Sequence, residues 1–186
     1  MADQTLKIWV KTNMVLGEEI PVLGNWFIIH FTENVGMAFG IELGGELGKT
    51  ILSLFRIAAV IAIGWYILHL MKVKAPCGLV MFLSLILAGA MGNIIDSAFY
   101  GMIFNESYHQ QATFLPEEGG YAPFLHGRVV DMLYFPIIRG NYPEWLPFLG
   151  GERFIFFRPV FNIADAAITT GVAGVLIFYK GFFHKH

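Results

Sequence analysis

Charged side chains are scarce in this chain of 186 residues: Asp, Glu, Lys and Arg make up only 14% of it, and the net charge is −2. Soluble domains carry about 25% charged residues, so too few polar side chains are present to cover a water-exposed surface. The near-neutral charge also provides no basic field that would attract nucleic acid. These features exclude a disordered chain, a coiled coil and a basic nucleic-acid-binding module, and they favour an integral membrane protein.

Residue patterns that carry several common chemistries are missing as well. The single cysteine, Cys77, can form no intramolecular disulfide, and the six histidines show neither His-x-x-x-His nor His-Glu-x-x-His spacing. The sequence contains no Gly-x-Ser-x-Gly motif and no phosphate-binding glycine loop. We therefore expect no metal site, no cofactor and no serine hydrolase of that kind.

Apolar residues are abundant, at 56% of the chain, and they are concentrated in long runs. A membrane-spanning helix needs about 20 mostly apolar residues. Three runs are long enough: residues 51–71, 78–100 and 159–179. Residues 2–16 also have apolar positions at helical spacing, but Asp3, Lys7 and Lys11 interrupt them. The sequence predicts a mainly α membrane protein with three spans and a short N-terminal helix.

The lysines predict the orientation of these spans. The short link 72–77 and the tail after residue 179 each carry two lysines, which is typical of cytoplasmic segments. Residues 1–50 and 101–158 are then external. Residues 20–41 are rich in β-forming residues and predict one or two short strands at the external interface. Residues 101–158, rich in proline and glycine, predict extended loops with small elements.

Polar side chains gather at the external ends of two spans, in the motifs Asn93-Ile-Ile-Asp96 and Asn162-Ile-Ala-Asp165. Asn-x-x-Asp spacing places both side chains on one face of a helix, and acids at membrane depth are costly and usually functional. A third acid, Asp131, interrupts an apolar, strand-like run.

Three functions agree with these acids. Two carboxylates in a half-dry site share one proton, so that one acts as base and the other as acid, and they can activate water against an amide. Alternatively, Asp96 and Asp165 form the proton relay of a small proton-coupled transporter component, or they only hold helices together in a structural subunit. A relay has no need of Asp131.

Five sequence blocks, in order along most of the chain, resemble the lipoprotein signal peptidases (signal peptidase II). The blocks are Asp3-Gln-Thr-Leu-Lys7, Asn34-Val-Gly-Met-Ala-Phe39-Gly, Gly92-Asn93-Ile-Ile-Asp96, Val129-Val-Asp131 and Phe161-Asn162-Ile-Ala-Asp165. The resemblance implies one membrane-embedded peptidase domain over residues 1–186. It implies a bundle of four transmembrane helices with a small external β-cradle and extended external loops.

The resemblance also implies an aspartic endopeptidase of the bacterial inner membrane, with its active site on the periplasmic side and its C-terminus in the cytoplasm. Its substrates would be prolipoproteins, cut before a diacylglyceryl-modified cysteine, and its other partners membrane lipid and globomycin-like cyclic peptide inhibitors. The catalytic aspartates fall on Asp131 and Asp165. The implied substrate-binding and supporting residues are Asp3, Lys7, Asn34, Asn93, Asp96, Arg128 and Asn162.

Three features depart from the family pattern. The first block begins at residue 3, which predicts a truncated first helix. Ser97 stands where the family usually has arginine, and Arg128 is the candidate to replace the contact of that arginine. The spacings between Asp96, Asp131 and Asp165 are longer than in compact members, which indicates insertions near 101–125 and 140–157.

Overall fold

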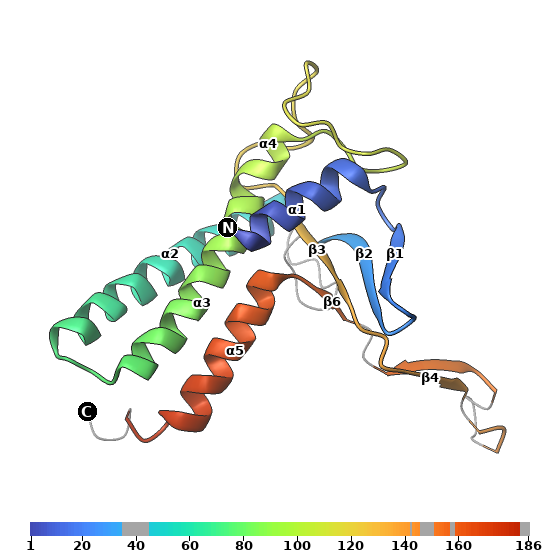
Figure 1. The fold of residues 1–186 in the computed structure, drawn as a ribbon. Helices are drawn as coiled ribbons and strands as arrows, with labels where there is room; N and C mark the ends of the chain where they lie inside the picture. The colour runs from blue at the N-terminus through green and yellow to red at the C-terminus, as the bar shows by residue number, and fades with distance from the viewer. Residues whose placement is uncertain (35–44, 142, 146–150, 157–158, 183–186) are drawn as a thin grey trace.

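Three helices lie side by side, with a short helix and a small sheet at one end of them (Figure 1). The computed structural model describes residues 1–34, 45–141, 143–145, 151–156 and 159–182. Its elements are α1 (Ala2–Asn13), β1 (Glu19–Leu23), β2 (Phe27–Asn34), α2 (Gly45–Lys72), α3 (Cys77–Ile95), a π-helical turn η2 (Asp96–Tyr100), α4 (Gly101–Ile103), β3 (Val129–Tyr134), β4 (Ile138–Asn141), β5 (Arg153–Phe156), β6 (Val160–Phe161) and α5 (Ile163–Phe178).

Two helices in the described residues are long and apolar enough to cross a membrane. They are Gly48–Lys72, with 25 residues, and Cys77–Ile103, with 27 residues, which includes α3, η2 and α4. Large apolar side chains of α2 face outward, as a lipid-exposed surface requires: Phe55 and Trp65 are 70% and 69% exposed. These two helices confirm that 51–71 and 78–100 are apolar helices of spanning length, and the turn between them confirms their hairpin.

The prediction of a third span over 159–179 was wrong at its start. Val160 and Phe161 form strand β6 instead, and α5 begins only at Ile163. Both residues have side chains that favour strands, and they pair with β3, which ends the sheet before the helix begins. With 16 residues, α5 is about 24 Å long. Neither α5 nor the 12-residue α1 reaches the length of a span, so a bundle of four spanning helices is not confirmed.

The predicted strands are present in a four-stranded antiparallel sheet with the order β1-β2-β3-β6. The strands expected within 20–41 are β1 and β2, and residues 35–41 lie outside the described residues. A second, two-stranded sheet, β4 with β5, overlaps the predicted insertion near 140–157 and projects beyond the main sheet (Figure 1). Pairing of β3 with β6 is the step that brings Asp131 near the start of α5.

Helices α3 and α5 pack closely because small residues line their contact. A Cβ atom added at Gly171 would lie 2.6 Å from the carbonyl oxygen of Phe82 and 2.6 Å from Cγ1 of Ile86. Gly89 of α3 is equally crowded, against Ala164 and Ile168 of α5. Small residues are the usual means of close helix packing in membranes. The two helices that carry Asn93 and Asp165 are therefore held at a fixed, short separation.

We expect Gly171→Ala to destabilise the protein, because its methyl group forces α3 and α5 apart. Overpacking of this kind typically costs about 1–3 kcal/mol. The matched control is Gly64→Ala in α2, where nothing lies within 4 Å of the added methyl group. Thermal unfolding in detergent should show a lower melting temperature for the first variant and no loss for the second. Equal melting temperatures would contradict the close α3–α5 contact.

Candidate active site

Asp131 lies within β3 and is only 5% exposed. Its Oδ1 accepts a hydrogen bond from Asn162 Nδ2 at 2.7 Å, and a side-chain hydrogen bond also joins it to Asn34. Burial and, next, the negative charge of Asp165 raise the pKa of Asp131 to about 7, against the opposing effect of these hydrogen bonds. A carboxyl group with this pKa can both take up and release a proton near neutral pH.

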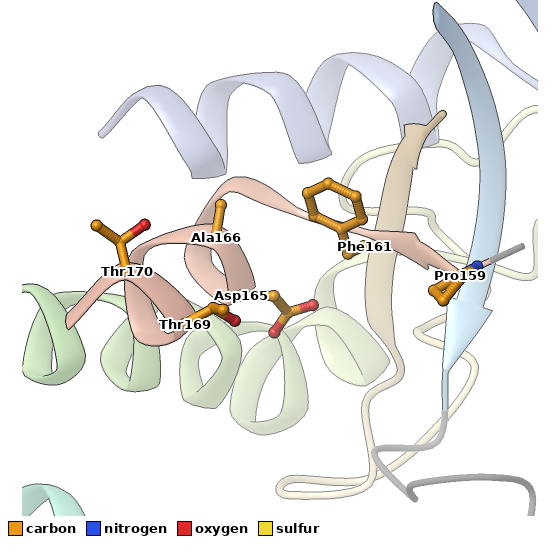
Figure 2. Close-up of a pocket in the computed structure, with 6 residues that line it drawn as sticks. All are labelled: Pro159, Phe161, Asp165, Ala166, Thr169 and Thr170. Atoms are coloured by element: carbon orange, nitrogen blue, oxygen red, sulfur yellow. The ribbon is translucent and has the colours of Figure 1, made fainter. Parts of the chain in front are cut away.

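Asp165 is the third residue of α5 and opens onto a cavity. Its Oδ1 accepts a hydrogen bond from Asn93 Nδ2 at 2.7 Å, and its Oδ2 accepts one from the backbone N–H of Asn162 at 3.4 Å. Figure 2 shows the residues that line the cavity. The cavity has a volume of about 500 Å³ and is lined by Pro159, Phe161, Asp165, Ala166, Thr169 and Thr170. Asp165 is therefore accessible to a ligand that enters this cavity.

Two asparagine amides connect the two aspartates. Asn162 Nδ2 donates to Asp131, and it also donates to Asn93 Oδ1 at 3.1 Å. Asn93 Nδ2 then donates to Asp165. The result is a continuous hydrogen-bonded path from one carboxylate to the other, Asp131–Asn162–Asn93–Asp165.

The surroundings fix the orientation of both amides. Lys7 Nζ donates to Asn93 Oδ1 at 2.9 Å, so the oxygen of this amide is occupied and its NH₂ group faces Asp165. The Asn162 Oδ1 accepts a hydrogen bond from the backbone N–H of Asp165 at 2.8 Å, so its NH₂ group faces Asp131. Asp131 and Asp165 therefore each accept a hydrogen bond from an asparagine NH₂ group.

The expectation that Asn-x-x-Asp spacing places both side chains on one helical face is confirmed for Asn93 and Asp96, because Lys7 Nζ lies 2.9 Å from Asn93 Oδ1 and 2.7 Å from Asp96 Oδ2. For the second motif it was wrong, because Asn162 precedes the helix. Asn162 is the N-cap of α5 and forms a reciprocal capping box with Asp165. Asn93 and Asp96 share Lys7 but differ in their other partners: Asn93 contacts Asp165, whereas Asp96, at the start of the π-helical turn, contacts α1 and β3. The second motif differs from the first because it lies at a helix end.

Asp96 is fully buried and joins three elements. Its Oδ2 lies 2.7 Å from Lys7 Nζ, and this lysine also lies 3.1 Å from Asp3 Oδ2. Gln4 Nε2 donates to Asp96 Oδ1 at 2.8 Å, and the backbone N–H of Val130 donates to its Oδ2 at 3.2 Å. Because Val130 precedes Asp131, this contact holds the strand that carries Asp131 against the end of α3.

Arg128 does not replace the missing arginine at Asp96 within the described residues. Its guanidinium donates to Glu33 Oε2 at 3.0 Å and to both carboxylate oxygens of Glu106, at 2.7 and 2.9 Å. The cation at Asp96 is Lys7 instead. The Ser97 hydroxyl donates to the Asn93 carbonyl oxygen at 3.1 Å, within the helix.

Sequence reasoning missed a second buried ion cluster beside the first. Lys11 is fully buried and pairs with Glu33, whose side chain is 2% exposed, and it donates to Ser107 Oγ at 2.8 Å. Burial alone would raise the pKa of Glu33, but pairing with Lys11 and hydrogen bonds from Arg128 and Ser107 lower it. The available signal was the four-residue spacing of Lys7 and Lys11, which places both on one face of α1.

The site thus unites most of the predicted residues. Asp131, Asp165, Asn93, Asn162, Asn34 and Lys7 form one network, Asp3 and Asp96 join it through Lys7, and Arg128 belongs to the neighbouring cluster. Among the residues that the structure describes, no group of three or more His, Cys, Asp or Glu side chains could hold a metal ion. The remainder of the Asn34 block, residues 35–40, lies outside the described part of the chain.

Comparison with known proteins gives consistent results. The family model for signal peptidase (SPase) II matches residues 1–182. A lipoprotein signal peptidase of Porphyromonas gingivalis is 54% identical over 183 residues, which cover 96% of this chain and 78% of the relative. One of Amoebophilus asiaticus is 41% identical over 178 residues, which cover 94% of this chain and 71% of that protein.

Solved structures with the same arrangement are membrane enzymes. A bacterial membrane enzyme determined by the in meso method at 2.3 Å resolution has a TM-score of 0.61 and 25% identity, and the match covers 95% of this chain and 79% of that one. A second such structure, at 1.9 Å, has a TM-score of 0.60 and 26% identity, with 95% and 83% covered.

We expect Glu33→Gln to destabilise the fold, because it leaves Lys11 buried without its counter-charge. Breaking one side of a buried ion pair typically costs about 3–5 kcal/mol. The control is Glu19→Gln, because Glu19 is 47% exposed in its pair with His30 and an exposed pair contributes at most about 1 kcal/mol. Denaturant unfolding in detergent measures both variants.

The lowered pKa of Glu33 also predicts how the stability difference between wild type and Glu33→Gln changes with pH. Because the folded state lowers the pKa of Glu33, its contribution is fully present above the ordinary pKa of a glutamate and disappears as pH falls through the lowered value. Wild type and Glu33→Gln should therefore differ at neutral pH and converge in acid. A constant difference between them, or equal stability at neutral pH, would contradict the role of this pair.

Proposed function

The chain belongs to the signal peptidase II family, and on that premise we propose that it is an aspartic endopeptidase that removes signal peptides from prolipoproteins. We assign catalysis to Asp131 and Asp165, within one peptidase domain over residues 1–186. The observation that carries this assignment is the hydrogen-bonded path through Asn162 and Asn93, which gives each carboxylate its own donor while one of them opens onto a cavity.

The two aspartates have different roles in this proposal. Asp131, with its raised pKa, holds the proton that the pair shares, and Asp165, in the cavity, is the carboxylate that accepts a proton from water. Water attacks the scissile carbonyl carbon as its proton passes to Asp165, and Asp131 donates its proton to the carbonyl oxygen. The carbon–nitrogen bond then breaks, the leaving nitrogen takes the proton from Asp165, and a hydroxyl proton returns to Asp131.

The surrounding polar residues act by positioning this pair. Asn93 and Asn162 orient the carboxylates, Asn34 adds a hydrogen bond to Asp131, and Lys7 holds the Asn93 amide in place. Asp3 and Asp96 balance the charge of Lys7. We assign Arg128 a supporting role at the start of β3, because it joins that strand to Glu33 and Glu106.

The substrate and location follow from the family. We propose that cleavage occurs before a diacylglyceryl-modified cysteine, that membrane lipid surrounds the site, and that globomycin-like cyclic peptides bind there as inhibitors. We place the enzyme in the bacterial inner membrane, with Asp131 and Asp165 at the periplasmic face and the C-terminus in the cytoplasm. The lysines of the 72–77 link support this orientation.

We expect Asp131→Asn and Asp165→Asn each to abolish nearly all cleavage of a diacylglyceryl prolipoprotein, because an amide keeps the shape of the side chain but removes the shared proton. The double variant should be little worse than either single variant, since residues that act as a unit are not additive. Asp96→Asn is the informative comparison and should retain more activity, because Asp96 only positions other groups. Cleavage of the purified substrate by each variant measures these effects.

The same two carboxylates, Asp131 and Asp165, determine how cleavage activity depends on pH. Activity should follow a bell-shaped curve, falling in acid when both carboxylates are protonated and falling in alkali when the pair loses its last proton. The alkaline limb should lie near the raised pKa of Asp131, about 7. Near-normal cleavage by Asp131→Asn or Asp165→Asn would reject the catalytic assignment.

We expect a cysteine introduced by Val73→Cys to be inaccessible to an impermeant thiol reagent in intact cells. Val73 lies in the lysine-bearing turn between α2 and α3, where it is 57% exposed in the isolated chain. Labelling should appear only after the cells are permeabilised, and Cys77→Ser in the same background removes the native thiol. Labelling from outside intact cells would reverse the proposed orientation.

A further inference from the structure

Thr169 lies one helical turn beyond Asp165 and shares its side of α5. The four-residue spacing places the two side chains on one face, and both line the cavity. Figure 2 shows the Thr169 hydroxyl directed toward the Asp165 carboxylate, whereas Ala166 and Thr170 point to a different side of the helix. Thr169 therefore adds a polar side chain to the cavity beside Asp165. The family resemblance did not include this residue.

Thr169 is exposed in the isolated chain and lines the cavity, so a ligand in the cavity can reach its hydroxyl group. Two hydroxyl groups of the helix Cys77–Ile103 are satisfied within that helix: Ser84 Oγ donates to the Val80 carbonyl oxygen at 2.8 Å, and Ser97 Oγ donates to that of Asn93. A hydroxyl group without a partner in an apolar environment is costly. In α5, whose other residues are mostly apolar, Thr169 places a hydroxyl donor in the lining of the cavity beside Asp165.

The ligand that such a donor fits is a peptide carbonyl oxygen. A peptide must be extended at its scissile bond, so its backbone carbonyl groups there lose their helical partners, and lipid supplies no replacement. Four residues of α5 rise about 6 Å, which is close to the length of two residues of an extended chain. The direction from Asp165 to Thr169 runs into the membrane, where the signal peptide lies in the proposed topology.

We propose that the Thr169 hydroxyl donates a hydrogen bond to a backbone carbonyl oxygen of the bound signal peptide, about two residues from the scissile bond. This inference rests on the proposed function and makes Thr169 a substrate-positioning residue of the same site. The hydroxyl bonds the peptide in the ground state and the transition state alike, so it strengthens binding without entering the chemistry.

The test compares steady-state cleavage of a synthetic diacylglyceryl prolipoprotein peptide by wild type, Thr169→Val, Thr169→Ser and Ser84→Ala. Valine keeps the shape of threonine and removes the donor, so Thr169→Val should raise KM about 3- to 10-fold with kcat unchanged. Thr169→Ser should keep the wild-type KM because it keeps the hydroxyl group. Ser84→Ala, which removes a hydroxyl group of α3 that does not line the cavity, should also behave as wild type, and all variants should melt like the wild type.

The results that would overturn this inference differ from the result that would overturn the proposed function. An unchanged KM for Thr169→Val, or an equal rise for Thr169→Ser or Ser84→Ala, would overturn the inference while wild-type cleavage keeps the proposed function intact. If the wild type leaves the substrate uncut, the proposed function fails and this inference with it.

The hydroxyl could also meet an ester carbonyl of the lipid, which offers the same acceptor chemistry. A substrate with ether-linked chains lacks these carbonyl groups and separates the two sources. Persistence of the Thr169→Val penalty with the ether substrate supports the peptide carbonyl. Its disappearance would assign the contact to the lipid ester and overturn the inference.

Discussion

The Asn162 side chain is the contact on which the rest of the site depends. Its oxygen accepts the backbone N–H of Asp165 and begins α5, while its nitrogen donates to Asp131 on β3. One amide therefore fixes where the helix starts and where the strand carboxylate points. An aspartate at this position would cap the helix as well, but it would place a third carboxylate between the other two. Only a neutral side chain with both a donor and an acceptor satisfies both neighbours.

The charge of Lys7, near Asp131 and Asp165, is also balanced without a direct ion pair to Asp131. Lys7 contacts Asn93, Asp3 and Asp96, and it lowers the pKa of Asp131 only as a lesser effect from beyond the asparagines. A direct lysine–aspartate ion pair at Asp131 would stabilise the ionised form and remove the shared proton. The lysine is instead neutralised by two acids that take no part in the proposed chemistry. Burial and Asp165 can then keep the pKa of Asp131 near neutrality.

Much of this arrangement could be predicted from the sequence. The spans around α2 and α3, the strands β1 and β2, and Asp131 in a strand follow from composition and periodicity. The start of α5 could not be predicted, because Val160 and Phe161 are equally suitable for an apolar span and for a strand, and only their pairing with β3 decides between them. The π-helical turn that begins at Asp96 could not be predicted either, since a change of helix type leaves no mark in hydrophobic spacing.

The structure also separates the three acids that a proton-relay transporter and a peptidase would use differently. A relay needs Asp96 to exchange protons, yet this carboxylate is fully buried and its oxygens are occupied by Lys7, Gln4 and the N–H of Val130. Asp96 therefore holds its neighbours in place and does not exchange protons, because its protonation would leave the buried Lys7 with less compensating charge. Asp165 has the opposite setting, with a cavity beside it. Its electrostatic partner is Asp131, an acid outside the spans for which a relay has no use, and two such carboxylates can act as the base and the acid in amide hydrolysis by water.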